Sequence, residues 1–178
     1  KAAIEAQRKR LEIDPNRADA LRALERLYEA EGRYEELVGV LLSRQQQIGD
    51  QEERKALGKR VALLYEEKLA DSGRAIEQWR ENIAAFGPDR ESLHALARLY
   101  EQSARHGELL DTLEAEVEFV TDASTRAALR FRMAELLRGS LSEPQRAIAV
   151  YEAALEDDPA HAGSLAALEA IAQDPGSP

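Results

Sequence analysis

The fold of this 178-residue chain is decided by a short stretch that recurs along it. The stretch first reads Arg26-Leu27-Tyr28-Glu29. Similar stretches follow at Leu63-Leu64-Tyr65-Glu66, Arg98-Leu99-Tyr100-Glu101 and Glu135-Leu136-Leu137-Arg138. The aromatic or leucine position falls at 28, 65, 100 and 137, so the spacings are 37, 35 and 37 residues. A nearly fixed period of this length indicates a repeat protein in which each unit is one small supersecondary motif.

A second series of residues supports the same period. The dipeptides Asp14-Pro15, Gly87-Pro88 and Asp158-Pro159 each follow a segment with helical periodicity, and they stand about two repeats apart. Proline cannot continue a helix, and glycine readily takes the backbone conformation that ends one. These dipeptides therefore mark helix ends.

Within each period, apolar residues twice show the spacing of an amphipathic helix. Leu21, Leu24 and Tyr28 share a face in the first half of a unit, and Ile76 and Trp79 do so in the second half of another. Each unit is therefore predicted to be a pair of antiparallel helices, termed A and B. We expect Trp79 to be buried between helices, because it lies on the apolar face.

We predict ten helices and no sheet, because Ala, Leu, Glu and Arg dominate whereas Val, Ile and Thr are sparse. The predicted helices span residues 2–12, 17–30, 33–48, 51–69, 73–86, 89–103, 106–120, 122–139, 143–157 and 161–173. Asp50 with Glu53 and Ser142 with Gln145 have the spacing of capping boxes, and Asp71 is a suitable N-cap.

The arrangement resembles the tetratricopeptide repeat (TPR) family over almost the whole chain. That family places large residues at positions 4, 7 and 11 of helix A, and Leu21, Leu24 and Tyr28 match them. Pro159 matches the proline at position 32. Glu25 departs from the pattern, because position 8 is usually small. The repeats are therefore degenerate.

The resemblance implies an all-α fold of antiparallel helical hairpins, stacked in a right-handed superhelical solenoid whose A helices line the concave face. We expect one repeat domain over residues 1–173, followed by a flexible tail over 174–178. The domain divides into a partial repeat 1–15, repeats 16–50, 51–88, 89–121 and 122–159, and a final helix 160–173. The first helix matches a B helix and the last an A helix. We therefore also expect a fragment of a longer array, packed against further repeats of the same protein.

Charge and composition narrow the classes of partner. Lysine plus arginine number 24 and aspartate plus glutamate 34, which gives a net charge of −10. Such an acidic chain is poorly suited to nucleic acid or to an anionic membrane surface. Apolar runs such as 61–65 are too short to span a bilayer. We expect a protein partner, no nucleic acid, no membrane insertion and, by default, a cytoplasmic location.

The residue patterns do not favour catalysis. The chain has no cysteine, which excludes disulfides, thiolate zinc sites and thiol nucleophiles. His94, His106 and His161 fall in different repeats without metal-ligand spacing. Acidic pairs such as Glu35-Glu36 lie at helix starts, where acids act as caps. We predict no enzymatic activity, no cofactor and no metal site.

The resemblance also implies which residues face the groove, namely positions 2, 5, 9, 12 and 13 of helix A. The predicted partner-binding residues at these positions are Arg22, Arg26, Lys59, Leu63, His94, Arg98, Phe131 and Arg138. The alternative is that the cations are solvated and paired with nearby acids, Arg26 with Glu29 and Arg98 with Glu101. Family members that clamp a terminal carboxylate need Lys at position 5 and Asn at position 9. Asn is absent from position 9 here, so we do not predict that activity.

The leading functional hypothesis is a non-catalytic interaction scaffold that binds an extended or helical segment of a partner in its groove. Because the groove gathers cations, we expect that segment to be acidic. The alternatives are a structural spacer in a larger assembly and a regulatory module of a multidomain protein. Clustered cations with exposed Leu63 and Phe131 would favour binding, whereas a groove neutralised by internal ion pairs would favour a spacer.

Overall fold

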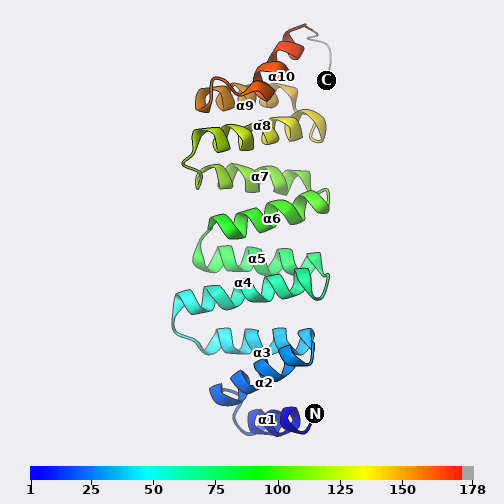
Figure 1. Cartoon of the computed structure of the whole chain (residues 1–178), viewed down its shortest axis with the longest axis vertical. Coiled ribbons are helices and arrows are strands. Elements are labelled where there is room, and N and C mark those ends of the chain that lie inside the picture. Colours follow the sequence, from blue (N-terminus) through cyan, green and yellow to red (C-terminus); the bar gives the residue numbers. More distant parts are fainter. Residues whose placement is uncertain (174–178) are drawn as a thin grey trace. The chain divides into compact units, whose positions relative to one another are not determined.

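The computed structural model describes residues 1–173, and this range contains ten α-helices and no strand (Figure 1). The helices are α1 (Ala2–Ile13), α2 (Ala18–Ala30), α3 (Tyr34–Gln47), α4 (Gln51–Glu67), α5 (Ser72–Phe86), α6 (Arg90–Gln102), α7 (His106–Val117), α8 (Ala123–Gly139), α9 (Pro144–Asp157) and α10 (Ala162–Gln173). The predicted all-α fold is confirmed, and helix ends differ from the predicted ones by a few residues at most. The predicted tail, 174–178, lies outside the described residues.

The chain forms two compact units, Lys1–Pro88 and a second that begins at Asp89. Unit 1 holds α1 to α5 and unit 2 holds α6 to α10. Within each unit, every helix packs against the next one in sequence, which makes a row of helices (Figure 1). The boundary between the units coincides with the predicted repeat boundary after residue 88. A single domain over residues 1–173 and the right-handed superhelix stay predictions.

The two units repeat the same local contacts at an offset of 72 residues. The guanidinium of Arg33 lies 4.9 Å from the centre of the Tyr28 ring, and the guanidinium of Arg105, 72 residues later, lies 4.9 Å from the ring of Tyr100. Each of these arginines also donates to the glutamate three residues after it. The same local contacts thus fix the turn from α2 to α3 and the turn from α6 to α7.

The four turns from an A helix to a B helix share one backbone feature. Each contains one residue in the left-handed region, at Gly32 (φ 67°), Ala70 (52°), Ala104 (53°) and Ser142 (56°). Only glycine takes this conformation without steric cost, and other residues lose about 1–2 kcal/mol there. Three of the four turns are therefore strained, and the chain tolerates this because the packed helices on both sides determine the turn.

The helix caps agree with the predicted ones in two places and differ in one. Asp50 Oδ1 accepts from the backbone N–H of Glu53 at 2.8 Å, and Asp71 Oδ1 caps α5 in the same way. The capping box predicted for Ser142 with Gln145 is wrong. Ser142 has a positive φ, and Glu143 is the N-cap of α9 without a side-chain cap bond. The left-handed turn occupies the position that the sequence pattern assigned to the cap.

Trp79 is buried completely, with 0% of its surface exposed, which confirms the prediction. Its counterpart 72 residues later, Tyr151, is also at 0%. Each of these rings lies on a B helix, α5 and α9, and fills the space against the preceding A helix of its unit. Among the described residues, the indole N–H of Trp79 has no hydrogen-bond partner, so the ring acts through its volume.

Replacing Trp79 by Ala removes this volume from the core of unit 1. We expect Trp79→Ala to lower the free energy of unfolding by roughly 3–5 kcal/mol, the usual cost of deleting a large buried aromatic side chain. Trp79→Phe should cost clearly less, because the indole N–H contributes no bond. Chemical denaturation followed by circular dichroism measures both variants. A loss below about 1 kcal/mol for the alanine variant would contradict this packing.

The strained turns give a matched pair of tests. Ala104→Gly should raise the free energy of unfolding by roughly 0.5–1 kcal/mol, because glycine relieves the left-handed strain. Gly32→Ala at the equivalent turn should lower it by about 1 kcal/mol, although a Cβ there meets nothing closer than Tyr34 Cε2 at 3.9 Å. Thermal or denaturant unfolding of the two variants measures the difference. Effects of the same sign would show that the two turns are not equivalent.

Candidate functional site

Within each unit, ion pairs connect the A helices with one another. Arg60 on α4 donates to Glu25 and Glu29 on α2, with 3.0 Å between Arg60 Nη2 and Glu29 Oε1. In unit 2, Arg132 on α8 donates to Glu101 on α6 at 2.7 Å. The exposed side chains of neighbouring A helices therefore belong to one surface in each unit, which we call the A-helix face.

Four of the predicted binding residues belong to the A-helix face of unit 1. Arg22 and Arg26 are exposed on α2, whereas Lys59 and Leu63 are half-buried on α4. Among residues 1–173, no carboxylate pairs with Arg22 or Arg26. The pair of Arg26 with Glu29 that we considered as an alternative is not formed, because the Glu29 carboxylate accepts from Arg60 instead.

The other four predicted residues lie in unit 2, His94 and Arg98 on α6, and Phe131 and Arg138 on α8. The His94 side chain is 72% exposed, and its Nδ1 lies 3.6 Å from Glu116 Oε1. Arg98 is exposed as well.

Phe131 and Arg138 are in contact with side chains of their own unit. The Phe131 ring is half-buried, with its centre 5.8 Å from that of Tyr151 and 5.3 Å from that of His161. Arg138 lies 3.4 Å from Glu135, whose carboxylate also accepts from the Tyr151 hydroxyl. Burial and this hydrogen bond raise the pKa of Tyr151. Part of this predicted surface is therefore occupied by internal contacts.

Glu25 stands where the TPR motif has a small residue, and the structure explains the exception. Its side chain is only 13% exposed and accepts from both Arg44 on α3 and Arg60 on α4. Burial alone would lower the pKa of Arg60, but the hydrogen bonds that it donates to Glu25 and Glu29 and the negative charges of these carboxylates outweigh burial, so the pKa is raised. The other three repeats carry buried alanines at this position, Ala62, Ala97 and Ala134. An ion network thus replaces small-residue packing among three helices of unit 1.

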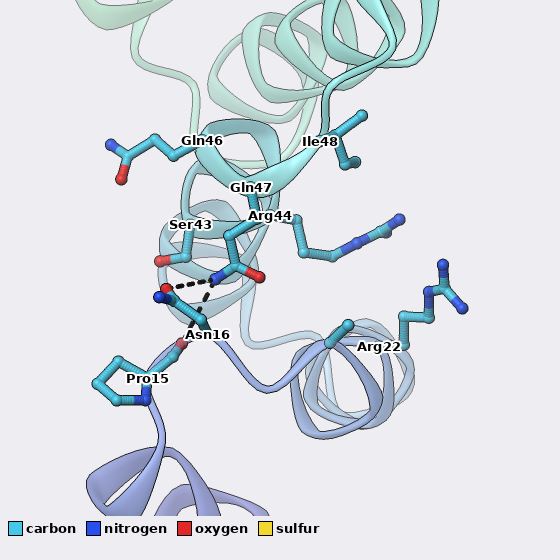
Figure 2. A pocket seen from close by; sticks show the side chains of 9 residues that line it. Pro15, Asn16, Arg22, Ser43, Arg44, Gln46, Gln47 and Ile48 are labelled. Carbon is cyan, nitrogen blue, oxygen red and sulfur yellow. Dashed lines mark hydrogen bonds between the residues drawn. The ribbon is translucent and has the colours of Figure 1, made fainter.

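An open cleft of about 780 Å³ lies in unit 1 beside Arg22 (Figure 2). It is formed by the turn between α1 and α2, the start of α2 and the end of α3. The lining residues are Pro15, Asn16, Ala18, Arg22, Ser43, Arg44, Gln46, Gln47 and Ile48. Of these, only Arg22 belongs to the predicted binding residues. The others were missed because the family pattern places groove residues on A helices, whereas α3 is a B helix.

Among residues 1–173, no three histidine, aspartate or glutamate side chains are grouped so that they could hold a metal ion. No helix in the same range is long and apolar enough to cross a membrane.

Comparisons with known proteins agree with this architecture. Residues 20–55 match the family model described as tetratricopeptide repeat, and this span covers α2, α3 and the start of α4. None of the curated proteins matches the sequence significantly. A similar solved structure is that of YrrB, described as a TPR protein with an unusual peptide-binding site. It is 16% identical, covers 93% of this chain and 81% of that chain, and has a TM-score of 0.51.

Two crystal structures of MamA are similar in fold as well, each with 17% identity over 88% of this chain. The aligned regions span 86% and 81% of the two MamA chains, with TM-scores of 0.51 and 0.52. Residues 20–55 thus match a tetratricopeptide repeat, and the fold over most of the chain is similar to that of solved TPR proteins.

Proposed function

We propose that this protein is a non-catalytic interaction scaffold that binds an acidic segment of a partner protein on its A-helix face. The TPR fold is in general that of protein-interaction scaffolds. The observation that carries the proposal is that Arg22 and Arg26 are exposed and make no ion pair among residues 1–173, whereas Arg44 and Arg60 beside them are paired. The chain has 34 acidic residues, so two exposed arginines on α2 that pair with none of those in the described range stand out.

The chemistry of the two free arginines favours a carboxylate partner. A guanidinium is a planar fork that can hold a carboxylate through two parallel hydrogen bonds. Arg22 and Arg26 are four residues apart on one helix, where like charges repel mildly. A bound anion relieves this repulsion. Leu63 on the neighbouring A helix adds apolar surface, so the expected segment carries at least one apolar residue.

The fold similarity to YrrB supports a binding function in general, because that protein is described as having an unusual peptide-binding site. A second candidate function is a structural spacer or a regulatory module of a larger protein. The internal contacts of Phe131 and Arg138 favour it for unit 2, because they occupy side chains that a partner would need. The proposal therefore rests mainly on unit 1.

A triple charge reversal tests the scaffold function. Changing Arg22, Arg26 and Arg98 together to Glu should weaken binding of a fluorescent peptide of alternating glutamate and leucine by at least about tenfold. The reversed charges would repel the peptide instead of pairing with it. Binding to the native protein should also weaken as salt rises, because exposed ion pairs are screened. Fluorescence anisotropy measures the affinity, and circular dichroism checks that helicity is unchanged.

The matched control reverses three exposed cations that lie on B helices or in a turn, Lys9, Arg80 and Lys68. This control changes the net charge equally and should keep most of the affinity. Equal affinity for the two triple variants, or an affinity that salt does not change, would show that the cations of the A-helix face are only solvated surface.

A further inference from the structure

The cleft of unit 1 has the composition of a site for an acidic side chain. Figure 2 shows Arg22 from α2 and Arg44 from α3 extending to the same side of the cleft, whereas Gln46 extends to the opposite side. The apolar part of the lining comes from Pro15, Ala18 and Ile48. Two cations beside an apolar wall suit a carboxylate with an apolar neighbour.

The two arginines of the cleft differ in how they are held. Arg44 is only 14% exposed, and its guanidinium donates to Glu25 and to Glu53, the latter at 3.2 Å. A guanidinium has five N–H donors, so Arg44 keeps donors in a fixed orientation. Arg22 is exposed and free to move onto an anion. A site with one fixed and one adjustable cation loses less conformational entropy on binding than a site with two mobile ones.

Gln47 adds a fixed acceptor to the same cleft. Its Nε2 lies 3.4 Å from the carbonyl oxygen of Pro15 and 3.2 Å from Asn16 Oδ1, and it donates to both (Figure 2). These bonds orient the amide and leave Gln47 Oε1 without a donor among residues 1–173. An amide oxygen so placed can accept from a backbone N–H of a bound segment.

Unit 2 carries different chemistry at the equivalent positions. Seventy-two residues after Arg22, Arg44 and Gln47, the sequence has His94, Glu116 and Phe119. Glu116 is buried, and its carboxylate lies near His94. Phe119 is 43% exposed. An acid now stands where unit 1 has an arginine, so this part of unit 2 repels an anionic side chain instead of holding it.

We propose that the cleft of unit 1 is the anchoring site for one carboxylate side chain of the bound segment. Arg22 and Arg44 hold the carboxylate, Gln47 Oε1 accepts a backbone N–H, and an apolar residue next to the acid packs on Ile48. The equivalent surface of unit 2 does not bind this group. This inference rests on the proposed scaffold function and gives it a location, a ligand group and an expected stoichiometry of one site per chain.

The test is a titration of the whole isotope-labelled chain with the blocked peptide acetyl-Glu-Leu-Glu-Leu-amide, followed by amide chemical shifts. Residues 17–18 and 43–48 should shift, whereas the equivalent residues 89–90 and 115–120 should not. Arg22→Gln should weaken the peptide by about tenfold, the loss of one charge-assisted pair. Arg22 is exposed, so this variant keeps the fold. Arg80→Gln, which removes the same charge from an exposed arginine on α5, should leave the affinity unchanged.

Each other outcome overturns the inference in a distinguishable way. Binding that shifts residues elsewhere and is equal for native protein and Arg22→Gln would remove the cleft as the anchor but leave the scaffold function standing. Equal binding of the analogue with glutamine in place of glutamate would show that the cleft does not select a carboxylate. No binding of the acidic peptide by the native protein would overturn both the anchor and the acidic-segment scaffold.

Discussion

The structure depends on one constraint, which is that a helical hairpin cannot bury its apolar face by itself. Each helix of a unit therefore packs on the next, and residues such as Tyr28, Trp79 and Tyr151 are buried between helices. The apolar residues lie on the faces that meet neighbouring helices. The residues on the remaining, exposed faces can therefore vary. The exposed cations of α2 can differ from those of α6 without cost to the core.

Arginine serves two purposes on these free faces. Arg60 and its counterpart Arg132 join neighbouring A helices by pairing with a glutamate, and the same pair occurs in both units. Pairs of this kind are partly exposed and contribute little energy each, but they fix the orientation of the side chains around them. Arg22 has no such role within the described residues. A cation with no internal partner in an acidic chain is the feature that a binding function explains.

The two units show how one backbone plan can carry different surfaces. Positions in the core tolerate few changes, because any change of volume creates a cavity or strain. Positions outside the core have no such limit, and there Arg22 is matched by His94 and Gln47 by Phe119. A duplicated scaffold with one altered surface can bind a segment on one unit and leave the other unit for a different contact.

The sequence by itself determined the helices, the repeat and the buried position of Trp79, because these depend on spacings within one helix or one repeat. The tertiary structure decided which charges pair. Glu29 is three residues from Arg26 but binds Arg60 on the next A helix, and Glu25 binds two arginines of other helices. The tertiary structure also decided where the cleft forms, because the cleft brings the turn between α1 and α2 next to the end of α3. Sequence spacing does not contain the distances between helices, and those distances select one partner among several arginines within reach.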